Sequence, residues 1–135
     1  MSSPIRVSEA ANLALHATGL LAACAMGETL SAESMARTLG ASRAHLAKVL
    51  QRLIKAGVVR SVRGPGGGYA LARRPQDVSL MEIYETVEGP VRVDKCLLGV
   101  PVCGRECCPL GALFHKLGRE LVEELSKTTL ADYQA

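Results

Sequence analysis

The chain has 135 residues, of which 48% are apolar, and its aromatic content is three tyrosines and one phenylalanine. This length suits one domain with one modest core of Leu, Val, Ala and Ile, and it excludes a large multidomain protein. The formal net charge is only +3. No uninterrupted apolar stretch reaches the roughly 18 residues of a membrane span, so we expect a protein without membrane association.

Residues 8–26 are predicted to form a long apolar helix. Ser8 can cap its N-terminus, and Gly27 is a suitable stop. Cys24 falls in the apolar register, so we expect it to be a small buried side chain in this helix. The preceding residues also resemble a lipoprotein cleavage site. The apolar run is interrupted by the polar residues Glu9, Asn12 and His16. This argues against export, so we expect a cytoplasmic protein.

Residues 41–71 indicate the function of the protein more clearly than any other part of the sequence. Ser42 can cap a helix that ends before Gly57, a residue suited to the left-handed position after a helix. Basic residues lie off its apolar stripe, which consists of Leu46, Val49, Leu50, Leu53 and Ile54. Two β-prone runs follow at 58–62 and 69–71, and the glycines around Pro65 permit a turn between them.

A shorter helix is expected just upstream, over residues 30–39. Ser31 is its candidate cap, and Gly40 supplies the turn to the next helix. Helix, turn, helix, strand, glycine-rich tip and strand together form a winged helix-turn-helix. The predicted fold class is therefore mainly α with a small β-wing.

Positive charge is concentrated in this unit. Residues 34–76 hold nine Lys and Arg and no Asp or Glu, so seven Lys and Arg and all thirteen Asp and Glu lie elsewhere. A block of one sign on an otherwise acidic chain favours a polyanion partner such as DNA. The alternative is a solvated basic face on a helical hairpin.

The rest of the chain reads as a link, a short helix, a loop and a long helix. After the polar residues 72–78, Ser79 and Glu82 form a capping box that opens a helix to about residue 87. A final helix is expected over 109–127, followed by a terminal turn near 129–132. Its long apolar stripe predicts a packing partner, and the stripe consists of Leu110, Leu113, Phe114, Leu117, Leu121 and Leu125.

The loop between these helices holds four of the five cysteines: Cys96, Cys103, Cys107 and Cys108. In a cytoplasmic protein, such a group argues for metal or redox chemistry rather than for structural disulfides. Thiolates are soft donors that suit iron–sulfur clusters or zinc. Three interpretations stay open, namely an iron–sulfur cluster, a metal-free thiol switch and a zinc site.

The combination of motifs resembles the Rrf family of bacterial winged-helix transcriptional regulators, which includes IscR and NsrR. The motifs that carry the resemblance run from His45 and Leu46 through LIKAGVVRSVRGPGGGYALA to VEG and then the cysteine group, and the resemblance itself extends over nearly the whole chain. The resemblance implies a homodimer that binds double-stranded DNA. Many members of the family carry an iron–sulfur cluster, of the 2Fe-2S or 4Fe-4S type, and others lack one.

The resemblance also implies cluster ligands. The family pattern has three cysteines about five residues apart. Cys96, Cys103 and Cys108 span the same interval, although the middle cysteine is displaced by one position and Cys107 is added. We favour Cys108 over Cys107 as the third ligand because it aligns with the family cysteine that opens the last helix. Gly111 stands where one branch has a histidine ligand.

A fourth ligand must then come from elsewhere. In some members the first helix donates a residue to the partner subunit's cluster, near the position of Asn12, which shares a helix face with His16. An imidazole is a competent iron ligand, whereas the Asn12 amide is weak and the Glu9 carboxylate is hard, so His16 is favoured. Asn12 and Glu9 are alternatives, and His115 is a weaker candidate.

These inferences predict a homodimeric, sequence-specific transcription regulator whose cysteine loop senses redox state, nitric oxide or iron–sulfur status. Two recognition helices related by a twofold axis would read major grooves about 34 Å apart, so the operator should be a palindrome. Arg63 at the wing tip is expected to enter a minor groove. The DNA-contact candidates are Ser42, Arg43, Ala44, His45, Lys48, Arg52, Arg60, Ser61, Arg63, Gly64, Gly66 and Tyr69.

We expect a DNA-binding domain over 1–88, a cysteine loop over 89–108 and a dimerisation helix over 109–135. The competing function from another class is an iron–sulfur electron-transfer protein or an enzyme. No nucleophile–base pair supports an enzyme. The GPGGG sequence also lacks the lysine and the following helix of a phosphate-binding P-loop. The sequence therefore predicts a protein without catalytic activity.

Overall fold

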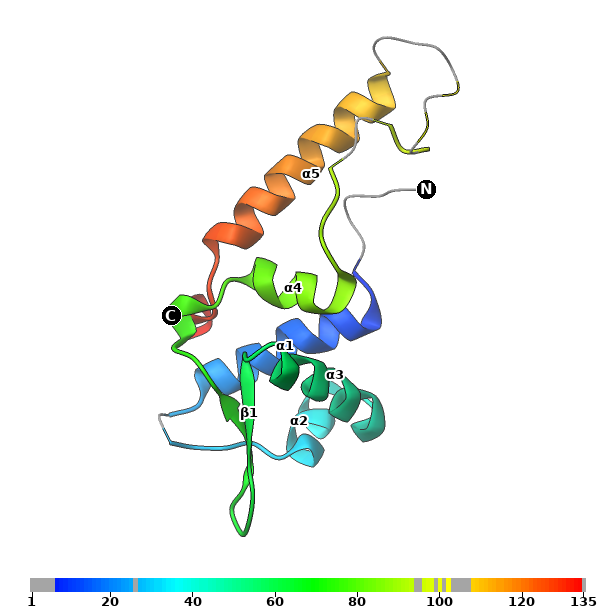
Figure 1. Ribbon diagram of the computed structural model, residues 1–135. Helices are drawn as coiled ribbons and strands as arrows, with labels where there is room; N and C mark the ends of the chain where they lie inside the picture. Colours follow the sequence, from blue (N-terminus) through cyan, green and yellow to red (C-terminus); the bar gives the residue numbers. More distant parts are fainter. Residues whose placement is uncertain are drawn as a thin grey trace.

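The computed structural model describes residues 7–25, 27–93, 96–98, 100, 102 and 108–134. The fold is mainly helical with one two-stranded antiparallel sheet, which confirms the predicted fold class. A body of helices and the small sheet lies at one end, and one long helix rises from it (Figure 1). In chain order the elements are α1 Glu9–Ala23, α2 Ala32–Leu39, α3 Arg43–Lys55, β1 Val59–Val62, β2 Gly68–Leu71, η1 Pro75–Asp77, α4 Leu80–Glu88, α5 Pro109–Lys127 and η2 Leu130–Gln134.

The helix starts follow from serine caps, as the sequence predicted. In each case the serine hydroxyl accepts a hydrogen bond from a backbone N–H in the first turn, which satisfies a donor that the helix leaves open. Gly40 and Gly57 adopt left-handed backbone, with φ of 64° and 77°, at the ends of α2 and α3. The caps are Ser8 for α1, Ser31 for α2, Ser42 for α3 and Ser79 for α4.

Four boundaries differ from the prediction. α2 begins at Ala32 rather than at residue 30, β2 begins at Gly68 rather than at residue 69, and the other two lie in α1 and β1. α1 ends at Ala23 rather than near residue 26, because Cys24 adopts extended backbone with φ of −72° and ψ of 149°. Cys24 is therefore half-buried just beyond the helix instead of buried within it, and its thiol donates to the Leu20 carbonyl at 3.4 Å. β1 begins one residue later than expected, at Val59.

The core lies among α1, α3, α4 and the base of the sheet. The apolar stripe predicted for α3 faces inward, with Leu46, Leu50 and Leu53 fully buried. Burial of one such leucine stabilises the fold by about 1.5–3 kcal/mol. Because this stripe points inward, the basic side of α3 is left facing solvent. Buried side chains from other elements complete the cluster, among them Leu13, Leu21, Met35, Val58, Val78, Ile83 and Leu130.

The wing is attached to the segment that precedes α2. Leu30 and Tyr69 form an antiparallel bridge, with backbone N–O distances of 3.0 and 2.8 Å. Nearby, the Thr29 hydroxyl donates to the Gly66 carbonyl at 2.8 Å. These contacts hold the wing against the helix-turn-helix unit, so the hairpin does not depend on its own two strands alone.

Replacing Gly68 by alanine should therefore destabilise the protein. A Cβ atom at this position would lie 2.5 Å from the Leu30 carbonyl oxygen, so the bridge between Leu30 and β2 would have to open. We expect the free energy of unfolding in urea to fall by about 1–3 kcal/mol. Ser61→Ala, an exposed change on the same hairpin, should alter it by less than about 0.5 kcal/mol. Equal unfolding midpoints for Gly68→Ala and wild type would contradict this account of the bridge.

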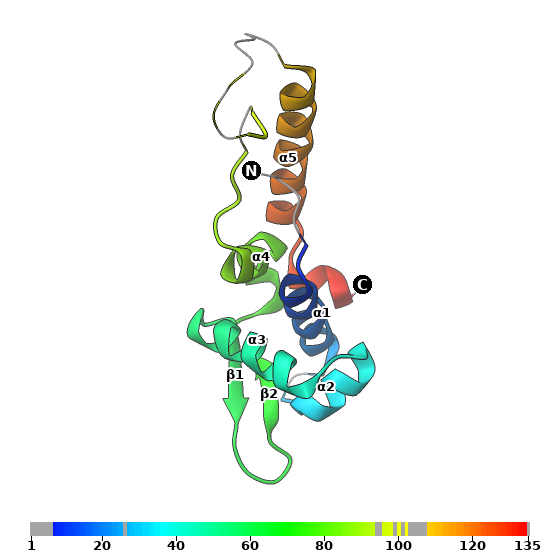
Figure 2. The same ribbon diagram turned by 90° about the vertical axis from the view of Figure 1, so that its right-hand side faces the viewer.

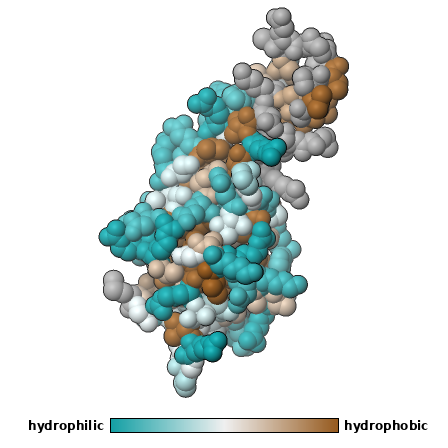
Figure 3. All heavy atoms as spheres, viewed as in Figure 1, coloured by the Kyte–Doolittle hydropathy of each residue, from teal (hydrophilic) through white to brown (hydrophobic). Residues whose placement is uncertain are grey.

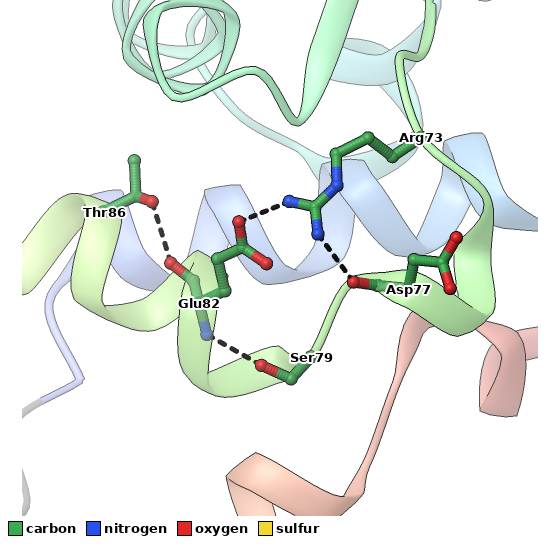
Figure 4. Close-up of polar contacts among 5 residues, drawn as sticks. All are labelled: Arg73, Asp77, Ser79, Glu82 and Thr86. Atoms are coloured by element: carbon green, nitrogen blue, oxygen red, sulfur yellow. Dashed lines mark hydrogen bonds and ion pairs between the residues drawn. The ribbon is translucent and has the colours of Figure 1, made fainter.

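Arg73 connects the base of the wing to α4 (Figure 4). Its guanidinium forms an ion pair with the Glu82 carboxylate and donates to the Asp77 carbonyl at 2.7 Å. Glu82 lies in the first turn of α4, where its backbone N–H donates to Ser79 at 3.1 Å. The Ser79 half of the predicted capping box is thus present, and the Glu82 side chain holds Arg73.

α5 rises away from the body in both ribbon views (Figure 1, Figure 2). Within α5 the only buried residues that the structure describes are Gly111 and Gly118. The chain then turns back, and η2 packs on α1, where Gln134 donates to the Ala22 carbonyl at 2.9 Å. None of the helices in the described residues combines the length and apolarity that crossing a membrane requires.

Candidate nucleic-acid interface and cysteine segment

The N-terminal half of α3 presents polar side chains to solvent. Ser42, Arg43, Ala44 and Lys48 are all exposed, as expected for residues that would contact DNA. Ser42 also caps the helix, with its hydroxyl 3.3 Å from the His45 backbone nitrogen. The amphipathic pattern of α3 thus places its basic residues on the side away from the core.

His45 differs from its exposed neighbours on α3. Its side chain is 34% exposed, and Nδ1 lies 3.6 Å from a carboxylate oxygen of Glu9 in the first turn of α1. The imidazole is therefore turned toward α1. This contact links the start of α3 to the start of α1.

The wing tip is exposed and shaped by glycines. Gly64 and Gly66 have φ of 95° and 73°, and the Gly67 N–H donates to the Gly64 carbonyl at 2.9 Å. These conformations are costly for other residues, so the tip sequence is matched to a tight turn. Arg63 stands exposed at its start. The hairpin projects beyond α2 and α3, at the end of the molecule opposite the far end of α5 (Figure 1, Figure 2).

The remaining candidate DNA contacts on the wing differ in exposure. Arg60 and Ser61 are exposed on β1. Tyr69 is half-buried, packs against the core and pairs through its backbone with Leu30. We infer that Tyr69 supports the wing more than it presents a side chain to a ligand.

The nine Lys and Arg residues of 34–76 fall into two groups, those with a partner within the protein and those without an ion pair. Three are in ion pairs: Arg37 with Glu33, Arg73 with Glu82 and Arg74 with Asp77. A fourth, Arg52, has partners on α4. Among the described residues the other five make no ion pair, and all are exposed on α3 or the wing: Arg43, Lys48, Lys55, Arg60 and Arg63. Within residues 34–76, the cations without an ion pair thus lie on α3 and the wing, where a phosphate backbone could approach them.

The guanidinium of Arg52 lies against the end of α4. Its Nη2 donates to the Val87 carbonyl at 2.7 Å and to the Thr86 carbonyl at 3.3 Å. The sequence placed Arg52 among the DNA contacts because it lies off the apolar stripe. The structure gives its side chain partners within the protein.

Two of the four clustered cysteines can be described. Cys96 and Cys108 are both half-buried free thiols. Cys108 is the N-cap of α5, and the Gly111 N–H donates to its sulfur at 3.5 Å. A helix N-terminus and an N–H donor suit the negative charge of a ligated sulfur. Cys103 and Cys107 lie outside the described residues, and within that part of the chain no three His, Cys, Asp or Glu side chains are grouped for a metal.

The fourth-ligand candidates occupy two different places. Glu9, Asn12 and His16 are exposed on α1, and His16 Nδ1 lies 2.8 Å from the Asn12 backbone carbonyl oxygen. His115 lies on α5, two turns after Cys108, and its Nδ1 is buried without a hydrogen-bond partner among the described residues.

Cys24 stands apart from the cysteine segment. Burial, and secondly the negative charge of Glu28, raise the pKa of its thiol. It therefore stays protonated at neutral pH, whereas metal ligation and disulfide exchange require the thiolate. Its side chain lines a cavity of about 540 Å³ between the end of α1 and the base of the wing.

Sequence comparison identifies relatives over most of the chain. NsrR of Bacillus subtilis (strain 168) is 33% identical over 122 residues, which cover 83% of this chain and 78% of that protein. IscR of Aliivibrio salmonicida is 37% identical over 89 residues, 64% of this chain and 49% of that protein. The chain thus spans about half the length of several curated relatives that it matches.

Solved structures support the same relationship. CymR (YrzC), the global cysteine regulator of B. subtilis, superposes with a TM-score of 0.80 at 28% identity, covering 96% of each chain. IscR of T. potens superposes with a TM-score of 0.73 at 28% identity, covering 95% of this chain and 85% of that one. The model of the Rrf2 family, described as an iron-dependent transcriptional regulator, matches residues 7–135. The chain therefore belongs to the Rrf2 family of winged-helix transcriptional regulators, which is not a family of enzymes.

Proposed function

We propose that this protein is a homodimeric, sequence-specific DNA-binding transcription regulator of the cytoplasm whose cysteine segment senses redox state, nitric oxide or iron–sulfur status. The observation that carries the DNA-binding part is the group of five exposed cations without an ion pair on α3 and the wing, namely Arg43, Lys48, Lys55, Arg60 and Arg63. Membership of the Rrf2 family supports it independently.

The proposed contacts follow from the geometry of the two elements. The exposed N-terminal half of α3 would enter a major groove, with Ser42, Arg43, Ala44 and Lys48 nearest the base edges and His45 beside them. Arg63 would insert into the adjacent minor groove, where its positive charge is favoured. On the wing, Arg60 and Ser61 would contact phosphates, and the backbone at Gly64 and Gly66 could approach the DNA closely. Two copies would read a palindromic operator.

Arg63→Ala should weaken operator binding without unfolding the protein. An exposed arginine that becomes desolvated on DNA contributes on the order of 1–3 kcal/mol to binding. The measurement is a titration of the duplex that wild-type protein selects from a random-sequence pool. Arg74→Ala is the matched control, because Arg74 is also an exposed arginine but is paired with Asp77 at 2.7 Å. If both variants bind as tightly as wild type, the wing has no part in recognition.

The exposed apolar residues of α5 and its neighbouring segment support a homodimer. Leu110 and Leu113 on α5 are 60% and 50% exposed, and Val100 and Val102 are 68% and 74% exposed. Apolar surface accordingly appears at the distal end of the molecule, around the far end of α5 (Figure 3). Apolar patches of this kind on a small protein typically mark an interface. A second copy packed along α5 would cover them.

The donor chemistry of the cysteine segment fits an iron–sulfur cluster. Cys96 and Cys108 are free thiols, and Cys108 already accepts an amide hydrogen bond of the type that stabilises cluster sulfurs. We propose Cys96, Cys103 and Cys108 as ligands, completed by His16 of the partner subunit. Cys107, Asn12 and Glu9 are the alternatives, and the unpartnered Nδ1 of His115 adds a candidate within the same chain. The cluster would supply iron that reacts with oxidants and nitric oxide.

A metal-free thiol switch on the same fold is the second candidate. Cys96 and Cys108 are half-buried and unpaired, so both thiols could be oxidised without a metal. Anaerobic purification, followed by an absorption spectrum and iron and sulfide assays, separates the two. Stoichiometric iron and sulfide would support the cluster. Their absence, together with operator binding that changes on thiol oxidation, would support the switch.

A further inference from the structure

The C-terminal end of α4 is held by a side chain from the recognition helix. A helix leaves its last four carbonyls without partners inside the helix. Two of these carbonyls in α4, those of Thr86 and Val87, accept hydrogen bonds from Arg52 at 3.3 and 2.7 Å. A cation at this position also interacts favourably with the negative end of the helix dipole. The contact therefore joins α3 to α4 through a charged group.

The same end of α4 is also bound to α1. The Ser8 hydroxyl donates to the Glu88 carboxylate while accepting from the Ala11 N–H at 3.1 Å, so one residue caps α1 and contacts α4. One residue further along α1, Glu9 lies 3.6 Å from His45 at the start of α3. The starts of α1 and α3 and the end of α4 thus form one polar junction.

The chain that leaves this junction leads directly to the cysteine segment. After Glu88, Gly89 turns with φ of 81°, and the chain then runs beside α5 toward Cys96 (Figure 1). Among the residues that the structure describes, the last turn of α4 is therefore the final regular structure before Cys96. A change in the cysteine segment that displaces Gly89 would act first on the carbonyls that Arg52 holds.

We propose that Arg52 is a positioning residue that transmits the state of the cysteine segment to the recognition helix, rather than a contact to DNA. The inference rests on the proposed function, since it requires that the cysteine segment control DNA binding. When the end of α4 shifts, the two hydrogen bonds carry α3 with it and change its presentation to the major groove. Without them, a shift at the end of α4 is no longer passed to α3 through Arg52.

Arg52→Lys separates this role from a simple phosphate contact. Lysine keeps the positive charge but lacks the planar group that spans two carbonyls. The measured quantity is the ratio of operator affinities between protein with intact cysteine chemistry, as purified anaerobically, and protein exposed to air until its spectrum or thiol content stops changing. We expect a wild-type ratio within the roughly 5–150-fold range typical of coupled sites, and a ratio within about twofold of one for Arg52→Lys. Lys55→Ala, which removes an exposed charge from the same turn of α3, should keep the wild-type ratio.

The outcomes distinguish the two proposals. A wild-type ratio of one would overturn the proposed sensing function and this inference with it. A wild-type ratio above five that Arg52→Lys preserves would overturn this inference alone.

A second measurement needs neither cluster nor DNA. In air-exposed protein, amide hydrogen exchange over residues 86–89 should be faster in Arg52→Lys than in wild type, and unchanged in Lys55→Ala. Equal exchange in all three proteins would show that Arg52 does not hold the end of α4, and would also overturn the inference.

Discussion

Anaerobically purified Cys108→Ala protein should lack visible absorption and bind its operator with an affinity that air no longer changes. Cys108 begins α5 and receives the Gly111 amide at its sulfur, so its loss removes both a ligand and the contact that orients it. A cluster left with two cysteines is open to solvent and oxidant and is expected to be lost during preparation. Absorption spectra and iron and sulfide assays on the variant check this.

Further variants test which of the remaining candidate residues bind the cluster. Cys24→Ala should keep the spectrum, because the Cys24 thiol has a raised pKa and lies at the end of α1. Colour retained in Cys108→Ala but lost in Cys107→Ala would reverse the choice of third ligand. Faster cluster decay in His16→Ala than in His115→Ala would support donation from the partner subunit, and the opposite order would place the fourth ligand on α5.

Leu113→Glu should dissociate the proposed dimer. The Leu113 side chain is 50% exposed in the single chain, and in the dimer it would be covered by apolar surface. An unpaired carboxylate at such a buried site costs on the order of 3–5 kcal/mol. This corresponds to a dimer dissociation constant about a hundredfold to several thousandfold higher. Sedimentation across a concentration series gives that constant, and operator affinity should fall with it because both half-sites must be occupied.

Ser126→Glu is the matched control for this change. It adds the same charge to α5, but residue 126 is exposed and lies on the other side of the helix from Leu113. Its dissociation constant should equal that of wild type. If Leu113→Glu also remains dimeric, α5 does not carry the interface through its apolar stripe.

The helix starts could be predicted from sequence because their causes are local. A serine cap acts within one turn, so Ser31, Ser42 and Ser79 marked the starts of α2, α3 and α4 without knowledge of the rest of the chain. The bounds of α5 were predicted in the same way, from Pro109 at its start and the apolar stripe along it. The end of α1 was wrong because Cys24 leaves helical backbone in a sequence that carries no breaker before Gly27.

The contacts that couple elements could not be predicted, because they join residues far apart in sequence. Arg52 looked like any other basic residue off the apolar stripe, and only the packing of α3 against α4 gives it the carbonyls of Thr86 and Val87. The bond from Thr29 to Gly66 likewise depends on the fold bringing residues 37 positions apart into contact. Neither pair has a local signal in the sequence. The DNA contacts and cluster ligands rest on residue type and family resemblance, and they stay predictions.

The bridge between Leu30 and Tyr69 has a consequence for how binding specificity could change over time. This bridge and the Thr29 hydrogen bond fasten the wing to the helix-turn-helix. In each subunit, the two elements would therefore contact their half of the operator as one rigid unit. The distance between the two DNA-binding units of a dimer would be set elsewhere, along α5, which buries little of its own surface within one chain. Substitutions in α3 and the wing would then alter which bases are read, and substitutions in α5 would alter the number of base pairs between the half-sites. The two properties could diverge independently among related regulators.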